Sequence, residues 1–378
     1  MRFAALFLLP ICLAAQTARF EDQPAILVAN DKLELLVLPE GGALASVVLK
    51  SDPAKLNPLW DPKRYARVGG RKHTGAVLGH FVCVDGFGPV SPEERDAGMP
   101  GHGEAHTRPW TTKLSRKEGA AFTLQQSAEM PRSQEILNRT IRIVDGEQIV
   151  YVQSELENLL AMDRPVNWAE HATIGAPFLE AGQTVVDMPV AKAKTRETGG
   201  QPPANLTLPL RSFVEFTWPK APLTAGGKMD MRATQPNSGI LGHTTCLLDP
   251  KRERVWVTAL HPGKRLILGY VFRQEEFPWL QTWLNYPANG ESARGLEFST
   301  QPYDVPRRQA IALGSMFGTP TYRWLPAKSK IQSRYLMFYT SAPEGMTQVD
   351  DIRMENGTLV VEDKKNRKTI RLAASQGW

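Results

Sequence analysis

The stretch EILNRTIRIVDGEQIVYVQSEL, residues 135–156, decides the fold class. Residues 135–144 and 148–156 are rich in the β-branched and aliphatic side chains that favour strands. Asp145-Gly146 between them is a strong signal for a tight hairpin turn. The stretch therefore predicts two long antiparallel strands that are adjacent in one sheet.

Similar short apolar segments, separated by turn residues, continue along the chain in both directions. They cover 25–29, 33–38, 46–49, 121–124, 211–218, 244–248, 254–260, 266–273, 295–300 and 335–340. No stretch sustains a 3.6-residue apolar period over several turns, and only 306–316 predicts a short helix, while 191–240 predicts long loops. Many short strands with turns between them predict an all-β protein, a large antiparallel β-sandwich.

The composition agrees with a globular protein that has a buried core. The chain has 378 residues, a formal net charge of +6, 42% hydrophobic and 22% charged residues, and 30 glycines with 29 prolines for its turns. These values exclude long disorder, a collagen-like fibre and a polytopic membrane protein. Cys83 and Cys246 either form a disulfide or remain two separate buried thiols.

The N-terminal residues 1–16, MRFAALFLLPICLAAQ, have the pattern of a secretory signal peptide. Arg2 supplies the positive charge, a short apolar run follows, and Ala14-Ala15 are small residues at a cleavage site. The apolar run is shorter than the ~20 residues that a membrane-spanning helix needs. A buried N-terminal helix and lipidation of Cys12 are the alternatives. We expect a secreted or periplasmic protein that is not embedded in a membrane.

The rest of the chain divides into a β-sandwich over 17–345 and a short C-terminal β-hairpin appendage over 346–378. In the appendage, 351–354, 358–362 and 369–372 resemble short strands, and Asn356-Gly357 marks a turn. Its lysines and arginines lack interleaved aromatic residues, so we expect a solvated edge rather than a nucleic-acid site.

Motifs for phosphate loops, dinucleotides, zinc proteases and nucleophile elbows are lacking in the sequence, so phosphate transfer, nicotinamide chemistry and zinc proteolysis have no support. Three clusters of polar and aromatic residues stand out instead: 101–110 with His102, Glu104, His106 and Trp110; 167–171 with Trp168, Glu170 and His171; and 294–301 with Glu297, Ser299 and Gln301. If the third cluster is a strand, its three named side chains share one face.

Aromatic faces beside polar side chains suit sugars, whose C–H faces are apolar and whose hydroxyls need hydrogen-bond partners. Trp279 and Trp283 precede the third cluster and add two further rings. The alternative for each of these residues is structural: a satisfied core histidine, a polar loop or a core tryptophan.

The clusters, in this order, resemble the galactose mutarotase-like superfamily, which contains the aldose 1-epimerases. The opening strand and Gly-Gly turn are similar to 36–43, LVLPEGGA, and the His-Gly…Trp loop to His102-Gly103 and Trp110. Asn158 and His171 resemble the Asn…His pair, and 295–301 with Asp304 resembles the Gly…Glu-Thr-Gln…Asp stretch. The resemblance extends over roughly residues 25 to 341.

The resemblance implies a galactose mutarotase-like supersandwich with a carbohydrate, a mono- or oligosaccharide, in a groove across one sheet. It implies mutarotation, in which a base takes the anomeric hydroxyl proton and an acid protonates the ring oxygen, with no metal or organic cofactor. His171 is the expected acid and Glu297 the expected base. His102, Glu104, Trp110, Trp168, His80, Ser299 and Gln301 are the expected substrate-binding residues.

Two departures from the family pattern indicate a divergent branch. When the family's Glu-Thr-Gln motif is aligned with Thr300-Gln301 of this chain, its catalytic glutamate corresponds to Ser299. Glu297 lies two residues earlier, ~7 Å along a strand. His80 stands roughly where the family carries an arginine. A non-catalytic carbohydrate-binding protein on the same sandwich is therefore the alternative to the isomerase. A hydrolase or lyase accessory would need a second carboxylate, for which Glu104 and Glu170 are the candidates.

Overall fold

The predicted hairpin is present in the computed structural model, which describes residues 17–68, 77–196 and 206–376. Strands β8 (Glu135–Val144) and β9 (Ile149–Asn158) pair antiparallel, with Ile143 opposite Val150. Gly146 has a φ of 87°, a left-handed conformation that glycine adopts without steric cost. The predicted signal peptide, 1–16, lies outside the described residues.

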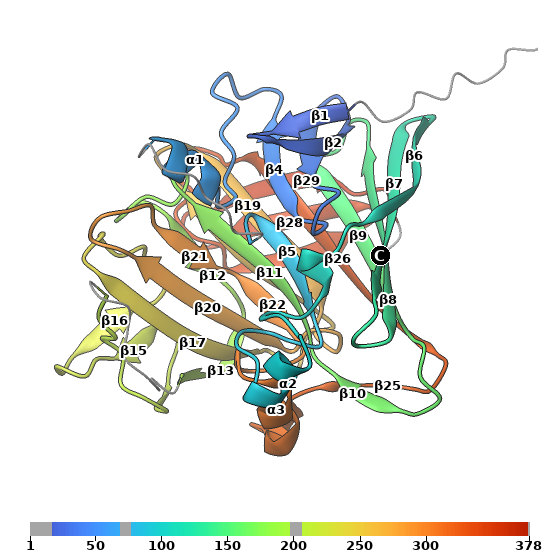
Figure 1. The fold of residues 1–378 in the computed structure, drawn as a ribbon. Coiled ribbons are helices and arrows are strands. Elements are labelled where there is room, and N and C mark those ends of the chain that lie inside the picture. Colours follow the sequence, from blue (N-terminus) through green and yellow to red (C-terminus); the bar gives the residue numbers. More distant parts are fainter. Residues whose placement is uncertain (1–16, 69–76, 197–205, 377–378) are drawn as a thin grey trace, which may run out of the picture.

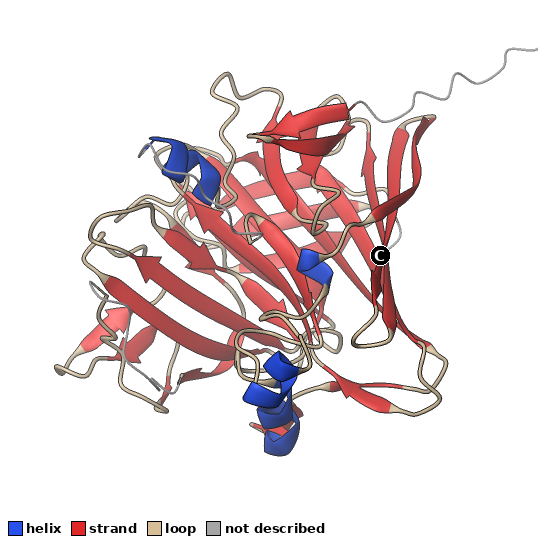
Figure 2. Cartoon of the chain, viewed as in Figure 1, coloured by secondary structure: helices blue, strands red, loops and turns tan. Residues whose placement is uncertain are grey.

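The hairpin belongs to an eight-stranded sheet, one of the two large antiparallel layers in Figures 1 and 2. Its order is β12 (Val185–Asp187), β18 (Arg254–His261), β19 (Leu266–Arg273), β26 (Lys330–Ser341), β9, β8, β7 (Ala121–Met130) and β6 (Thr111–Glu118).

The second layer is a twelve-stranded sheet. Its order is β1 (Thr17–Phe20), β2 (Gln23–Ala29), β3 (Leu33–Val37), β4 (Leu44–Leu49), β5 (His80–Val84), β11 (Trp168–Gly175), β21 (Ala293–Gly295), β20 (Trp279–Tyr286), β17 (Ile240–Leu248), β13 (Val190–Thr195) and β14 (Glu215–Phe216). The twelfth strand, β22 (Glu297–Ser299), pairs with β11 and β20.

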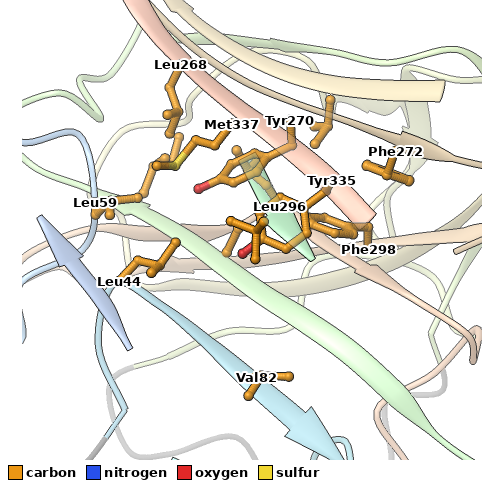
Figure 3. Packing of buried hydrophobic residues seen from close by; sticks show 14 of the residues in the cluster. Leu44, Leu59, Val82, Leu268, Tyr270, Phe272, Leu296, Phe298, Tyr335 and Met337 are labelled. Carbon is orange, nitrogen blue, oxygen red and sulfur yellow. The ribbon is translucent and has the colours of Figure 1, made fainter. Parts of the chain in front are cut away.

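The main hydrophobic core fills the space between the two layers. Figure 3 shows side chains of the twelve-stranded sheet, such as Leu44, Val82 and Phe298, in the same cluster as Tyr270 and Met337 of the eight-stranded sheet. Burial of apolar surface between two sheets is the main stabilising term of such a fold. The all-β sandwich predicted from the sequence is confirmed.

The C-terminal residues form a three-stranded sheet at the three short segments that the sequence predicts as strands. Its strands are β27 (Asp351–Glu355), β28 (Thr358–Asp363) and β29 (Lys368–Ala373). Leu359 and Val361 pack in one buried cluster with Trp256 and Leu336 of the eight-stranded sheet. The appendage is thus a third layer on the outer face of that sheet rather than a solvated edge.

Short elements complete the fold and cover the ends of the sandwich. They are α1 (Pro62–Val68), α2 (Pro92–Asp96), the 3-10 helix η1 (Ala105–Thr107), α3 (Arg307–Leu313), and the strand pairs β10 (Arg164–Val166) with β25 (Arg323–Leu325), β15 (Lys220–Pro222) with β16 (Lys228–Asp230), and β23 (Ser315–Met316) with β24 (Thr319–Pro320). In the part of the chain that the structure describes, no helix has both the length and the apolar character of a membrane span.

Several predicted segments differ in detail from the structure. The segment 211–218 forms only the two-residue strand β14, and 295–300 is interrupted at Leu296 between β21 and β22. The predicted helix is shorter than 306–316 and is α3. Strands β5, β11 and β20 were not predicted from their own residues. Cys83 in β5 and Cys246 in β17 are separate buried thiols, not a disulfide.

Candidate active site

A pocket of about 310 Å³ opens on the face of the twelve-stranded sheet that points away from the main core. It is lined by three histidines, two acids and a set of apolar and aromatic side chains: His102, His171, His243, Glu297, Asp304, Trp60, Val77, Phe81, Phe87 and Trp283. Aromatic walls around a few convergent polar groups are typical of small-molecule sites.

The register of the sheet brings His171 and Glu297 together. Glu170 of β11 lies opposite Phe298 of β22, so the next residues in the same register, His171 and Glu297, are neighbours on the pocket face. The Nε2 atom of His171 is 3.4 Å from Oε1 of Glu297. A titratable base and a titratable acid therefore stand side by side in the pocket.

The chain around Leu296 directs Glu297 into the pocket. Leu296 turns its side chain into the main core, and its backbone N–H donates to the carbonyl of Ala172 at 2.7 Å. Glu297 faces the opposite way, and its carboxylate lies where a Cβ atom on Gly295 would stand. Glycine at 295 is thus the residue that leaves room for the carboxylate.

Burial acts on the two groups in opposite directions. Removal from water, reinforced by the charges of His102 and His243, holds the pKa of His171 well below its usual value. Removal from water and the nearby carboxylate of Asp304 raise the pKa of Glu297 well above its usual value. The pair is therefore most stable when it is uncharged and holds one proton on the carboxyl group.

Neighbouring side chains fix the His171 ring. Its Nδ1 atom is 3.1 Å from the hydroxyl of Thr173, two residues along the same strand. Phe81, its partner in β5, stacks on the ring with centroids 4.3 Å apart. The Nε2 atom consequently remains directed at Glu297.

His102 enters the pocket from the loop after β5. Its φ of 65° lies in the left-handed region, and its Nδ1 accepts the backbone N–H of Gly88 at 3.1 Å. A neutral imidazole that accepts at Nδ1 carries its hydrogen on Nε2. Burial lowers the pKa of His102, which favours this neutral form.

The structure also brings residues into the pocket that were not assigned a role from the sequence. His243 lies in β17 opposite Trp283 of β20, and Trp283 meets Trp60 edge to face at 5.8 Å. Asp304 forms an ion pair with Arg196 at 2.6 Å. Asp304 belongs to the quoted motif, but His243 and Arg196 have no local sequence signal.

Glu104 and Trp110 lie outside the residues that line this pocket. Glu104 is buried and accepts the backbone N–H groups of Arg132 and Ser133 at 2.9 and 3.0 Å. The indole N–H of Trp110 donates to the carbonyl of Ala105 at 3.0 Å. Both side chains hold the loop that carries His102.

His80, Trp168 and Glu170 face the main core. The Nε2 atom of His80 is 2.9 Å from Glu170, and the indole N–H of Trp168 donates to the other oxygen of the same carboxylate at 3.2 Å. The ring of His80 stacks on Tyr335 of the opposite sheet, with centroids 5.3 Å apart. These residues form a buried polar group behind the pocket.

Ser299 and Gln301 are also buried and engaged. The hydroxyl of Ser299 donates to the carbonyl of Gln301 at 2.6 Å, and the Gln301 amide donates to the carbonyl of Tyr303. Of the nine site residues predicted from the sequence, the structure brings His102, His171 and Glu297 into the pocket. Neither Glu104 nor Glu170 supplies a second carboxylate there, whereas Asp304 does.

Comparisons with known proteins identify the fold. Solved structures that resemble the chain include a Klebsiella pneumoniae protein provisionally described as an aldose 1-epimerase, with a TM-score of 0.62, 12% identity and coverage of 85% of this chain and 80% of that one. Another is a galactose mutarotase-like protein from Clostridium acetobutylicum, with a TM-score of 0.60, 14% identity and coverage of 87% and 99%. No protein-family model and no curated protein matches the sequence. At these low identities the likeness shows the fold alone, and the chain has the β-sandwich fold of these structures.

Proposed function

We propose that this protein is a secreted or periplasmic carbohydrate-active protein, an aldose 1-epimerase-like mutarotase that uses His171 and Glu297 at the anomeric centre of a sugar. The observation that carries the proposal is the 3.4 Å approach of His171 Nε2 to Glu297 Oε1 inside an aromatic-walled pocket. The two sugar oxygens that exchange protons, O1 and O5, are bonded to the same carbon. An adjacent acid and base suit that substrate.

The uncharged pair contains the one proton that the reaction needs. Transfer of this proton from Glu297 to His171 gives a carboxylate base and an imidazolium acid. The carboxylate takes the proton from O1, the C1–O5 bond breaks as C1=O forms, and the imidazolium protonates O5. Rotation of the aldehyde and the reverse transfers close the ring as the other anomer. These steps are proton transfers, so they require no metal or organic cofactor.

The walls of the pocket support a carbohydrate as the ligand. Trp60 and Trp283 lie edge to face on one side, and Phe87 lies beside His102 and His171. Indole and phenyl faces bury the apolar C–H face of a pyranose, while His102 and Asp304 offer a donor and an acceptor for its hydroxyls.

A non-catalytic carbohydrate-binding protein is the second candidate. The observation in its favour is that the position aligned with the family's catalytic glutamate carries Ser299, whose hydroxyl is buried and bonded to Gln301. Such a protein would bind the same sugars in the same pocket without exchange of the anomers.

Anomer equilibration distinguishes the two candidates. Fresh α-glucose and α-galactose, followed by polarimetry, should equilibrate faster with wild-type protein than without it. His171→Ala should lower this rate by about 10²- to 10⁴-fold, the usual contribution of a general acid. Wild-type protein that binds the sugars but leaves the spontaneous rate unchanged would support the binding protein and contradict the isomerase.

A further inference from the structure

His243 faces Glu297 from the side opposite His171. The Nε2 atom of His243 is 3.9 Å from Oε2 of Glu297, whereas His171 approaches Oε1. The carboxyl group is thus flanked by an imidazole at each oxygen. Within the described ranges, His243 Nε2 and Glu297 Oε1 are buried atoms without a hydrogen-bond partner. Buried polar atoms of this kind call for a ligand or solvent partner.

Arg196 determines which nitrogen of His243 carries the hydrogen. Its Nη1 donates to His243 Nδ1 at 3.0 Å. Oδ1 of Asp304 is 3.1 Å from the same nitrogen and 2.6 Å from Arg196 Nη1, so this oxygen lies in the ion pair with the guanidinium. Since Nδ1 accepts from the guanidinium, the neutral imidazole carries its hydrogen on Nε2, directed toward the pocket.

Asp304 holds the arginine in that position. Its Oδ2 accepts from Arg196 Nη1 at 2.7 Å, and its backbone carbonyl accepts from Nη2 at 3.1 Å. The guanidinium therefore has two anchors besides the imidazole. Arg196 and Asp304 act on the pocket through His243 and are positioning residues in this respect.

We propose that His243 is a further catalytic residue, which donates its Nε2–H to the anomeric oxygen O1 of the sugar. This inference rests on the proposed mutarotase function. The 3.9 Å between His243 Nε2 and Glu297 Oε2 is too long for a hydrogen bond, but one oxygen at about 2.8 Å from each atom bridges it. A hydroxyl in this place accepts from His243 and donates to Glu297.

The bridging hydroxyl is the one that loses its proton. When Glu297 takes the O1 proton, the electron pair of the O–H bond forms C1=O, the C1–O5 pair moves to O5, and His171 protonates O5. Negative charge develops on O1 during this step, and the His243 N–H stabilises it without transferring a proton. Donors fixed at such a position typically contribute a factor of 10² to 10³ in kcat.

Kinetics of anomer exchange test the role of His243. His243→Leu should lower kcat by about 10²- to 10³-fold with little change in KM, since the donor acts mainly in the transition state. His243→Gln, which keeps an N–H donor, should recover part of the loss. His261→Gln is the matched control, because His261 is a buried histidine that pairs with Glu180 outside the pocket. Thermal unfolding of each variant checks the fold. Wild-type kcat in a folded His243→Leu protein would overturn the inference.

Nitrogen NMR of ¹⁵N-histidine-labelled protein separates this inference from the proposed function. We expect His243 to show its hydrogen on Nε2 in wild type, to lose this preference in Arg196→Met, and to shift when glucose or galactose is added. A hydrogen on Nδ1 in wild type, or a His243 signal that sugar leaves unchanged, would refute the role of His243. A wild-type protein that shows the predicted tautomer and sugar shift, but no anomer exchange, would refute the mutarotase proposal and the catalytic role together, and leave His243 as a sugar-binding donor.

Discussion

Gly295 makes room for the carboxylate of Glu297. The two residues lie on the same face of the sheet, on either side of the core residue Leu296, and a Cβ atom on Gly295 would overlap the carboxylate. The glycine of this stretch therefore has a specific physical role. It allows the Glu297 side chain to fold back along the sheet toward His243 and His171.

Gly295→Ala should displace Glu297 and impair the site while the sandwich still folds. The methyl group occupies the place of a side-chain carboxylate, so the carboxylate must move away from His171. We expect at least a tenfold loss of anomer exchange, because a misplacement of about 1 Å costs up to 10²-fold. Polarimetry measures the rate. Gly263→Ala is the control, since its Cβ would meet only the flexible end of Gln183 at 3.3 Å and the His261 ring.

Either position 299 or position 297 could carry the catalytic base, and the surroundings of the two side chains favour Glu297. Glu297→Gln should lower the exchange rate by about 10²-fold or more, since an amide takes no proton. Ser299→Ala should keep the rate and lose about 1 kcal/mol of stability, because the Ser299 hydroxyl donates a hydrogen bond to the Gln301 carbonyl. Ser299→Glu combined with Glu297→Gln should remain inactive. Recovery of activity in this double variant would show that the base belongs at 299.

The strands that follow period-2 patterns were predictable from the sequence. In β8, buried and less buried positions alternate, with Leu137, Ile141 and Ile143 on the core face, and the turn residues Asp145-Gly146 follow its end. Here the local sequence alone specifies the pairing, because one face is buried and the other is not.

The strands that carry the pocket were not predictable in this way. All residues of β5 and β11 are buried, since the main core covers one face and the pocket loops cover the other. Polar residues such as Glu170 and His171 therefore stand on both faces, and the alternation disappears. The family resemblance points to His171, but it aligns the family's glutamate with Ser299, two residues from Glu297.

His243 illustrates what a sequence alone does not provide. Its contact Arg196 is 47 residues away along the chain, and no acid or arginine adjoins His243 in sequence. The pairing of β13 with β17 brings the two together, so the arrangement depends on the sheet register. Conversely, Trp168 belongs to one of the three polar clusters and His80 stands roughly where the family carries an arginine, but strand alternation directs both side chains into the core.

The C-terminal sheet should be required for the stability of the whole sandwich. Leu359 is fully buried in the cluster that contains Trp256 and Leu336 of the eight-stranded sheet. Leu359→Ala should lower the free energy of unfolding by about 2 to 5 kcal/mol, the usual cost of a large-to-small change in a core. Denaturant titration measures this, with exposed Thr369→Ala as the control, which should change stability by less than about 0.5 kcal/mol. A wild-type unfolding curve for Leu359→Ala would show that the third layer is energetically separate.

The pH dependence of exchange should show a plateau between the two shifted pKa values. Burial lowers the pKa of His171 well below 6.5 and raises the pKa of Glu297 well above 4.5, so the pair holds one proton from the pKa of His171 up to the pKa of Glu297. At lower pH both groups are protonated and no base remains, while at higher pH both are unprotonated and no acid remains. We expect kcat/KM to fall on both sides, with the acid limb centred below 6.5. An acid limb centred above 6.5 would contradict the burial argument.

Glu297→Gln should become more stable relative to wild type as the pH rises. The folded pKa of Glu297 is raised, so above pH 4.5 the folded protein keeps a proton that the unfolded chain releases. The folded state then binds more protons, and its stability decreases with pH until the folded pKa is passed. Glutamine does not titrate and avoids this loss. The difference in Tm between Glu297→Gln and wild type, measured from about pH 5 to about pH 8, should therefore increase steadily.

Glu104→Gln is the comparison variant. Glu104 is also a buried carboxylate, but it accepts hydrogen bonds from two backbone N–H groups, so its replacement should destabilise the protein. A Tm difference for Glu297→Gln that stays constant or shrinks would mean that the carboxyl group is already ionised in the folded protein.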